Sequence, residues 1–587
     1  MVQLLRFIKK YKLQAILAPL FKMLEASFEL MVPLVVATMI RDGIGAGDAL
    51  CIRKMGGVLL LLAVVGLVSS VTAQYFSAKA ACGFAADMKR ELFAHMQKFS
   101  YAEIDRLGSS TLITRMTGDA NTVQNGVNMV LRLFLRSPFI VIGAMVMAFT
   151  VDVNSAWIFV CVIPILFVVV MGLVVVTIPM FQKVQKRMDA VLGLTRENLS
   201  GVRVIRAFTR EEEEVREFET RNRELVRFQL FAGRVSAIMN PLTYVIINLA
   251  LVILLYRGAI RVEGGLLTQA KLVALVNYMS QILVELIKFA NLIITITKAI
   301  ASGNRIQKVF ETEPTLKISG KNLSADWAAP QLISFEHVGY TYEGAGAPTL
   351  TDIDFSVHPG EMLGIIGGTG SGKTTLVHLL THFYDVTEGR VVLGGVDAVD
   401  LDQSEIRKHI AIVMQKAVLF KGTIRSNLAW GRADATDEEM YEAIRIAQAE
   451  DVVNGKEGGL DAEVEQGGRN FSGGQKQRLS IARALASNPD ILILDDSASA
   501  LDYATDAALR AELGSLQERR REMGHPLTLV VISQRTSSVL QADRILVLDD
   551  GLLVGAGRHE ELLADCEIYR EIHESQNRQD RTGQEGR

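Results

Sequence analysis

The chain has 587 residues, 49% of them hydrophobic, and its mean hydropathy is +0.25. It is too apolar for an ordinary water-soluble protein and long enough for two or more domains, so we expect a membrane-embedded part. The formal net charge of −3 gives no electrostatic signal for nucleic acid, which is therefore not expected as a partner.

Six apolar stretches long enough to cross a bilayer as helices lie in the first half of the chain. They cover residues 14–40, 56–76, 129–151, 156–178, 236–257 and 271–298. The connections after the second and fourth stretches are long and rich in Lys and Arg, whereas the others are short and only lightly basic. This bias predicts a multi-pass protein of the cell (inner or plasma) membrane with both termini in the cytoplasm.

The two long loops are expected to continue the membrane helices into the cytosol, because residues 184–193 and 211–225 hold helix formers and no proline. Hydrophobicity then falls, and proline and glycine appear, across residues 311–332. We therefore predict a membrane domain at 1–310 with cytosolic coupling loops, a linker at 311–332, a second domain at 333–575 and a polar tail at 576–587.

The second domain alternates β-rich runs with helical patterns, which is typical of an α/β fold with a parallel sheet. The predicted strands cover residues 333–342, 362–366, 410–414, 491–494, 527–532 and 544–548.

A glycine-rich turn follows the second of these strands and fits the phosphate-binding pattern G-x-x-x-x-G-K-[ST] in full. Backbone N–H groups in such a turn cradle phosphates, Lys373 reaches the terminal phosphates, and Thr374 is placed to ligate Mg²⁺. The chain is therefore expected to bind a nucleoside triphosphate. The predicted binding residues here are Gly367, Gly368, Thr369, Gly370, Ser371, Gly372, Lys373, Thr374 and Thr375.

Two further motifs belong to the same chemistry. The apolar run at 491–494 ends at Asp495, which suits a buried strand that brings a carboxylate to a metal ion, although the run alone also fits an ordinary core strand. About a hundred residues beyond the P-loop, Ser472 precedes two glycines and a glutamine, so that a serine cap opens a helix whose N-terminus is suited to phosphate.

In this order and spacing the motifs resemble the ATP-binding-cassette (ABC) superfamily, and specifically exporters with fused membrane and nucleotide-binding domains. The resemblance covers nearly the whole chain. It implies a six-helix transmembrane bundle of the type IV exporter followed by an α/β P-loop domain, with ATP and Mg²⁺ as cofactors. It also implies that Tyr342 stacks on adenine and that Gln415 senses Mg²⁺, which Thr374 and Asp495 bind as well. The signature residues are then Ser472, Gly473, Gly474 and Gln475, and the D-loop ends at Asp502.

Two departures from the family pattern affect hydrolysis. Asp496 stands where the family has a catalytic glutamate, and Gln534 stands where it has a switch histidine. The shorter carboxylate is withdrawn from an attacking water, and an amide has no titratable ring. Because family cassettes pair head to tail, we expect a degenerate site on this chain and a signature motif that completes a competent site on a different partner. A homodimer with two slow sites is the alternative.

Residues 108–119 and 197–208 resemble the exporter coupling segments that dock on a cassette, although each also fits a solvated loop. The implied mechanism is alternating access, in which closure of the cassettes on ATP moves these segments and switches the membrane helices.

Charged residues inside the spans are expensive and are therefore candidate functional residues. Lys22 with Glu25, and Glu285 with Lys288, are spaced to neutralise each other, whereas Glu29 has no such near partner. Glu25, Glu29 and Glu285 are the predicted substrate contacts, with structural pairing as the alternative for the paired residues. Glu25 and Glu29 share one helix face and would favour cationic amphiphiles, although Asn240, Asn248 and Gln281 fit a polar path equally well. We expect export of drug-like or lipid-like amphiphiles from a lipid membrane. An ATP-binding membrane regulator or sensor, and a siderophore importer with the exporter fold, are the alternatives.

Overall fold

The computed structural model describes residues 2–317 and 323–584 of the chain. Parts of the predicted linker and polar tail, residues 318–322 and 585–587, lie outside the described residues. The chain divides into two compact units. Residues 1–98 and 107–313 form the membrane unit, and residues 99–106 and 314–587 form the nucleotide unit.

Within the residues that the structure describes, six helices are long and apolar enough to cross a bilayer, which confirms the six predicted spans. About 20 residues suffice to cross the hydrocarbon core, yet these helices have 42 to 53 residues and therefore continue well beyond it, as expected. Their bounds are Gln3–Ile44, Ala49–Met96, Ser109–Val151, Val153–Ser200, Glu211–Glu263 and Gln269–Phe310.

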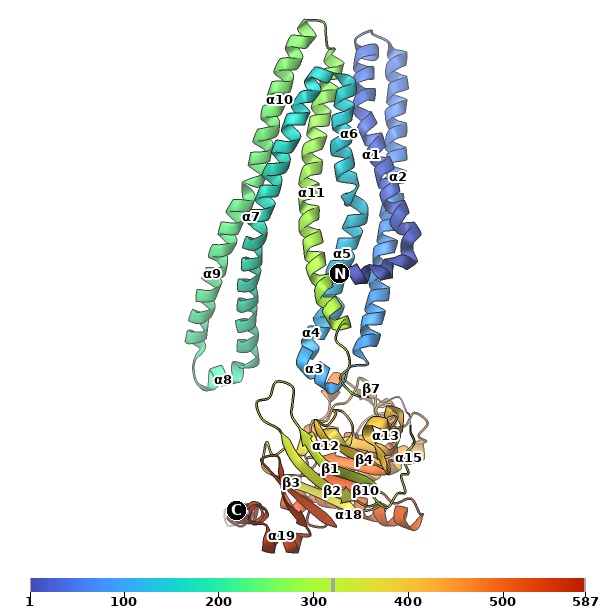
Figure 1. The fold of residues 1–587 in the computed structure, drawn as a ribbon, viewed down its shortest axis with the longest axis vertical. Coiled ribbons are helices and arrows are strands. Elements are labelled where there is room, and N and C mark those ends of the chain that lie inside the picture. The colour runs from blue at the N-terminus through green and yellow to red at the C-terminus, as the bar shows by residue number, and fades with distance from the viewer. Residues whose placement is uncertain (1, 318–322, 585–587) are drawn as a thin grey trace. The chain divides into compact units, whose positions relative to one another are not determined.

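Figure 1 shows two groups of helices in this unit. Helices α1 (Lys12–Thr38), α2 (Ala49–Met96), α6 (Arg136–Val151) and α11 (Gln269–Phe310) lie side by side. Helices α7 (Val153–Ser200), α9 (Glu211–Ala237) and α10 (Met239–Glu263) form an arm that is closed at its end by α8 (Val202–Ala207). Shorter helices in the first long loop are α3 (Tyr101–Leu107), α4 (Ser109–Thr114) and α5 (Ala120–Met129).

Small residues allow the membrane helices to pack closely. A Cβ atom added to Gly143 of α6 would lie 2.4 Å from a methyl carbon of Leu30 on α1, and one added to Gly126 of α5 would lie 2.2 Å from the Cβ of Ala299 on α11. Such contacts are typical of membrane bundles, where dispersion rather than water exclusion holds the helices together.

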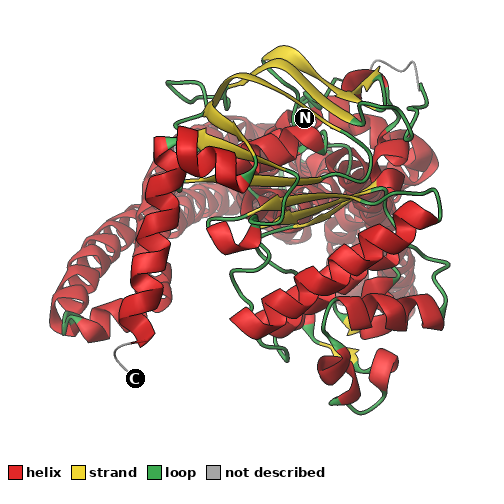
Figure 2. Cartoon of the chain, turned by 90° about the horizontal axis from the view of Figure 1, so that it is seen from below, coloured by secondary structure: helices red, strands yellow, loops and turns green. Residues whose placement is uncertain are grey.

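The nucleotide unit is built on a six-stranded sheet with helices on both faces (Figure 2). Its order is β12-β11-β3-β10-β9-β6, and all of its strands are parallel except β12, which pairs antiparallel with β11. The bounds are β12 (Leu552–Gly557), β11 (Arg544–Asp549), β3 (Met362–Gly367), β10 (Thr528–Ile532), β9 (Ile491–Asp495) and β6 (Ile410–Val413). A parallel α/β sheet was predicted, and five of these strands match the predicted runs.

A second, antiparallel sheet has the order β2-β1-β4-β5, and only its strand β1 was predicted. Its strands are β1 (Ile333–Tyr340), β2 (Leu350–Val357), β4 (Glu388–Leu393) and β5 (Val396–Asp397). Two short strands, β7 (Gly422–Thr423) and β8 (Glu463–Val464), form a separate pair. The main helices are α12 (Lys373–Leu380), α13 (Gln403–His409), α14 (Ile424–Leu428), α15 (Asp437–Ile446), α16 (Glu450–Asn454), α17 (Gly473–Ala486), α18 (Tyr503–Glu522), α19 (His559–Asp565) and α20 (Glu567–Gln584).

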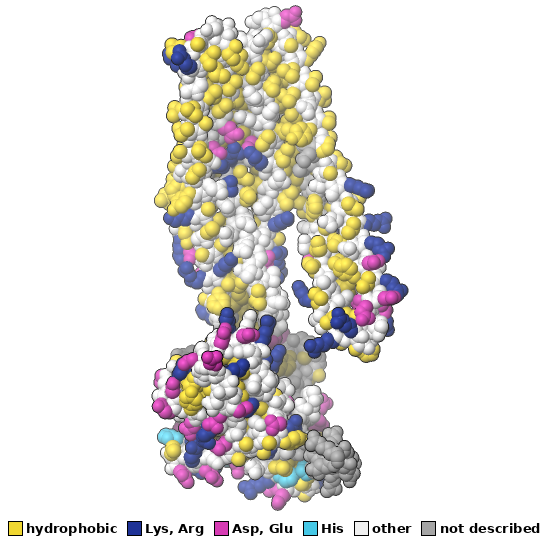
Figure 3. Space-filling view, turned by 180° about the vertical axis from the view of Figure 1, so that it is seen from behind, with side chains coloured by type: hydrophobic (Ala, Val, Ile, Leu, Met, Phe, Trp, Pro, Cys, Tyr) yellow, Lys and Arg dark blue, Asp and Glu magenta, His cyan; other side chains and the backbone are white. Residues whose placement is uncertain are grey.

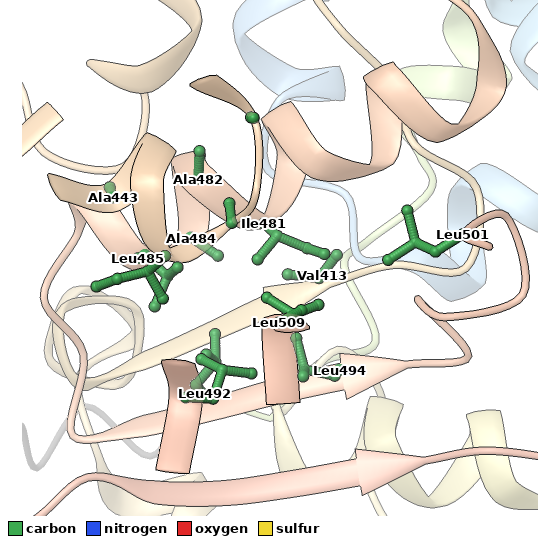
Figure 4. Close-up of a cluster of buried hydrophobic side chains, with 14 of the residues drawn as sticks. Val413, Ala443, Ile481, Ala482, Ala484, Leu485, Leu492, Leu494, Leu501 and Leu509 are labelled. Carbon is green, nitrogen blue, oxygen red and sulfur yellow. The ribbon is translucent and has the colours of Figure 1, made fainter. Parts of the chain in front are cut away.

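Strand β9 shows why the carboxylates that follow it are held in place. Side chains alternate across a strand, and in β9 both faces are buried. Leu492 and Leu494 pack among α15, α17 and α18 (Figure 4), while Ile491 and Ile493 belong to the hydrophobic cluster on the opposite face. A strand anchored on both faces delivers its C-terminal residues to a fixed position.

Candidate nucleotide site and membrane charge cluster

The P-loop joins β3 to α12 and requires glycine at specific positions. A Cβ at Gly367 would lie 2.1 Å from the carbonyl oxygen of Leu548 on the neighbouring strand, so no side chain fits there. Gly370 and Gly372 have φ angles of +89° and +95°, in the left-handed region that favours glycine. The loop thereby turns tightly into the N-terminus of α12, where unpaired backbone N–H groups favour anions.

Lys373 is the first residue of α12 and is buried in the loop. Its ammonium donates hydrogen bonds to the carbonyl oxygens of Gly367 (2.9 Å) and Gly368 (2.5 Å) and to the Ser371 hydroxyl (3.2 Å). Burial lowers the pKa of Lys373 from its ordinary value, while Asp496 and Asp495 act in the opposite direction. The lysine is therefore held by the loop and faces the two carboxylates.

Asp495 ends β9, and Asp496 begins the turn that follows. Burial and the neighbouring Asp496 carboxylate raise the pKa of Asp495 to about 6, against the opposing effect of Lys373. Asp496 has a φ angle of +45°, is fixed by a backbone bond from its N–H to the Ile532 carbonyl oxygen (3.0 Å), and accepts a hydrogen bond from Gln415 Nε2 (3.1 Å). The structure therefore brings these predicted site residues together at the carboxyl ends of adjacent parallel strands, where α/β folds bind ligands.

The predicted switch residue Gln534 follows β10 and is exposed. Gln576 of α20 makes three hydrogen bonds to the same loop. Its Nε2 donates to the Gln534 carbonyl oxygen (2.7 Å), and its Oε1 accepts from the N–H (2.9 Å) and the hydroxyl (3.1 Å) of Thr536. Sequence reasoning missed Gln576, which it placed at the start of a polar tail. No local pattern marks a residue that acts through a contact 40 positions away.

Tyr342, the predicted adenine platform, lies beside the P-loop helix. Its hydroxyl is 3.1 Å from Thr375 Oγ1, and its ring packs edge-on against Tyr340 and Tyr384. Tyr384 in turn donates a 2.6 Å hydrogen bond to Asp105 of α3. The predicted nucleotide platform is thus connected through one tyrosine to a segment of the first long loop.

The part of the first long loop that belongs to the nucleotide unit precedes the predicted coupling segment in the sequence. Residues 99–106 belong to the nucleotide unit, whereas Leu107 and the predicted segment 108–119 belong to the membrane unit. Tyr101 holds residues 99–106 in the nucleotide unit, because its aromatic ring stacks on Phe383 with a centroid distance of 4.5 Å.

The signature residues open α17 as predicted. Ser472 and Gln475 form a reciprocal capping box, in which the Ser472 hydroxyl accepts from the Gln475 N–H and the Gln475 side chain accepts from the Ser472 N–H (2.9 Å). Asp502 caps α18 in a similar way by accepting from the Thr505 N–H (3.0 Å). Among the described residues, no hydrogen bond joins the Ser472 cap to Lys373 or Asp496.

The membrane unit holds a cluster of charges that we call the Arg136 cluster, formed by Lys22, Glu25, Glu29, Arg136, Glu285 and Lys288. The guanidinium of Arg136, on α6, is its centre and bonds Glu285 Oε1 (2.6 Å) and Glu29 Oε2 (2.7 Å). Figure 3 shows acidic and basic side chains gathered within the apolar half of the molecule. Glu29, which has no partner of opposite sign nearby in the sequence, is therefore paired with a cation on another helix.

The expected neighbouring pairs are present in this cluster. Lys22 bonds Glu25 (2.5 Å), and Lys288 bonds Glu285 (2.8 Å), which also accepts from the Ser137 hydroxyl (3.0 Å). Three carboxylates thus meet three cations, and the cluster carries no net formal charge. Glu285 is almost fully buried, whereas the side chains of Glu29 and Lys288 are 40% and 43% exposed.

Each of the two units matches a known protein family. The family description "ABC transporter transmembrane region" matches residues 15–286, and "ABC transporter" matches residues 350–499. The chain is 34% identical over 573 residues to an uncharacterized ABC transporter ATP-binding protein of Mycobacterium tuberculosis, with 97% of each chain covered. It is also 34% identical over 576 residues to the uncharacterized ABC transporter ATP-binding protein YfiB of Bacillus subtilis, with 98% of each covered.

Two further similarities are informative about function and fold. The ATP-dependent lipid A-core flippase of Salmonella typhimurium is 29% identical over 578 residues, which cover 97% of this chain and 96% of the flippase. A solved bacterial Atm1-family ABC exporter with ATP bound superposes with a TM-score of 0.79 at 23% identity, covering 96% of this chain and 98% of that chain. The chain therefore belongs to the ABC transporter family, as a half-transporter with the exporter fold whose membrane domain is fused to an ABC ATPase domain.

Proposed function

We propose that this chain is one subunit of a heterodimeric, ATP-driven exporter whose own P-loop site hydrolyses ATP poorly. The observation that carries the proposal is the pair of departures at Asp496 and Gln534, at a site whose binding residues are otherwise complete. Asp496 is one methylene shorter than glutamate, and its carboxylate is bonded by Gln415. Because a misplacement of about 1 Å can cost a hundredfold in rate, this site suits ATP binding better than turnover.

The signature motif, in contrast to the hydrolytic residues, keeps the family pattern, and its helix cap is intact. Ser472 and Gln475 fix the start of α17, and a Cβ at Gly474 would lie 3.0 Å from the Ala500 carbonyl oxygen. In the head-to-tail arrangement of cassettes, this helix N-terminus would complete the nucleotide site of a partner half-transporter.

The ATPase activity of the purified chain, alone and co-purified with a candidate partner half-transporter, tests this proposal. We expect activity only in the mixed complex, insensitive to Asp496→Asn and abolished by Gly474→Asp, which adds a carboxylate where phosphate would bind. An active lone chain that Asp496→Asn inactivates would instead establish a homodimer. Tight ATP binding without turnover in any combination would favour a regulator or sensor.

We propose Mg²⁺ as the metal cofactor. Thr374, Gln415 and Asp495 offer hydroxyl, amide and carboxylate oxygens, which are the hard ligands that Mg²⁺ prefers. Bound there with ATP, the ion would neutralise phosphate charge, while the chain's own residues position the nucleotide.

The raised pKa of Asp495 predicts that affinity for the Mg²⁺–nucleotide complex depends on pH. With a pKa of about 6, the Asp495 carboxyl is mostly protonated below that pH. The bound proton then competes with Mg²⁺ for the carboxylate. Affinity should rise about tenfold from about pH 5 to about pH 7 through this group. Titration with a fluorescent ATP analogue checks this, with Asp495→Asn as the comparison, because titration of the nucleotide itself is common to both proteins. Equal pH dependence in the two proteins would contradict the assignment.

We further propose a drug-like or lipid-like amphiphile as the substrate, moved outward by alternating access. The similarity to a lipid A-core flippase supports an amphiphile with acyl chains. The Arg136 cluster removes the reason to favour cationic compounds, because its carboxylates are balanced within the protein. Of the three predicted contacts, Glu25, Glu29 and Glu285, the most exposed side chain is that of Glu29.

A further inference from the structure

A groove of about 600 Å³ lies between helices α7 and α9 of the membrane unit. The ring of Phe228 forms one wall of the groove, which we call its aromatic floor, and the Arg187 guanidinium stacks over this ring at 4.0 Å from its centroid. The lining carries four basic side chains and one acidic side chain, which gives a net formal charge of +3. The groove is lined by Lys183, Lys186, Arg187, Ala190, Arg221, Glu224 and Phe228.

The four cations are not equally available. Arg187 is paired with Glu224 at 2.5 Å, and Arg221 with Glu217 at 2.6 Å. Lys183 and Lys186 are exposed, and neither forms an ion pair within the part of the chain that the structure describes. Two free ammonium groups therefore stand at one side of a partly aromatic groove.

The position of the groove along α7 places it next to the bilayer. The apolar stretch of this span ends near residue 178, so Lys183 is five residues or about 8 Å further along the helix. The headgroup layer on each side of a bilayer is itself about 5–8 Å thick. Phe181 of α7 and Phe231 of α9 are exposed, both lie nearer the bilayer than the Arg187–Phe228 contact, and both provide apolar contact for the interface.

The C-terminal end of α7 and the C-terminal end of α11 emerge on the same side of the membrane, because the chain crosses the membrane twice between them. The nucleotide domain follows α11 in the sequence and is therefore on that side too. ATP is available on that side, which is therefore the cytoplasmic face. Anionic lipids attract basic side chains close to this surface.

We propose that the groove between α7 and α9 binds the headgroup of an anionic phospholipid of the cytoplasmic leaflet. The phosphate would accept hydrogen bonds from Lys183 and Lys186, whose ammonium groups carry three donors each. The Phe228 ring and the Arg187 guanidinium, which lie further from the bilayer, would contact the outer end of the headgroup, and the glycerol and acyl chains would extend back into the bilayer beside Phe181. A small free anion would gain from the charge alone and not from the aromatic floor, so the geometry favours a lipid.

Binding of fluorescent phosphatidylglycerol to the full-length protein in detergent tests this site, with equally labelled phosphatidylcholine as the neutral lipid. The double variant Lys183→Gln/Lys186→Gln removes the two free charges. The matched control Arg216→Gln/Arg223→Gln removes two exposed charges from α9 outside the groove, where they pair with Glu212 and Glu219.

We expect the groove variant to bind phosphatidylglycerol roughly 30-fold more weakly, with phosphatidylcholine binding and the control variant unchanged. The thermal unfolding midpoint should not move in either variant, since these side chains are exposed. Undiminished phosphatidylglycerol binding by the groove variant, or equal loss in the control, would overturn the proposal. Complete displacement of the lipid by millimolar inorganic phosphate would mean a free-anion site and would overturn it too.

Discussion

The variant Arg136→Met is expected to lose folding stability on the scale of about 3–5 kcal/mol, because removing one partner from a buried ion cluster leaves the others uncompensated. Glu285 would keep Lys288 and Ser137, but Glu29 would lose its 2.7 Å partner. The variant should also weaken the connection among α1, α6 and α11. Thermal unfolding of the purified protein in detergent measures the effect.

A matched control and a rescue make this test specific. Lys288→Met removes a half-exposed cation with a single contact to the cluster, and should cost far less than Arg136→Met. The double variant Arg136→Met/Glu29→Gln also removes the carboxylate charge that loses its partner, and should recover part of the lost stability. If Arg136→Met and Lys288→Met unfold at the same temperature, Arg136 is not the centre of the cluster.

The variant Lys373→Met is expected to bind ATP about a hundredfold more weakly, a loss typical of removing a buried charge that meets phosphate. Methionine keeps the apolar stem but leaves Asp495 and Asp496 facing the phosphates without a cation. The three bonds from the ammonium to Gly367, Gly368 and Ser371 are lost as well.

Equilibrium binding of a fluorescent ATP analogue measures this loss. Lys416→Met is the control, because Lys416 is exposed and has no ion pair among the described residues. Lys416→Met should bind ATP as the unmodified protein does, and both should unfold at similar temperatures. An affinity for ATP that survives Lys373→Met would show that the P-loop does not carry nucleotide binding.

Local patterns in the sequence were sufficient for the elements that position the candidate site. Six spans follow from runs of apolar residues, and the P-loop from the spacing of its glycines and Lys373. Strands β3, β9 and β10 were predicted because buried parallel strands are continuous apolar runs. Strands β2 and β4 were missed because charged residues interrupt them, and the pairing of β4 with β1 joins residues about fifty positions apart.

The contacts that the sequence did not predict join residues far apart in the chain. Arg136 reaches Glu29 across 107 positions and Glu285 across 149, and Gln576 reaches Thr536 across 40. Arg136 left one usable signal, since a charge inside the predicted apolar stretch 129–151 is costly and needs partners. Gln576 left none, because a glutamine in a polar helix is ordinary until its partner is known.

The assignment of residues 99–106 to the nucleotide unit has a consequence for any attempt to isolate that unit. The stretch of chain from residue 314 onwards lacks two side chains that pack in this unit, because Tyr101 and Asp105 come from a loop far earlier in the sequence. A fragment that begins there would expose the faces of Phe383 and Tyr384 that this loop covers. Such a fragment is a domain with one of its own parts missing, and aggregation or weak nucleotide binding by it would say little about the intact transporter.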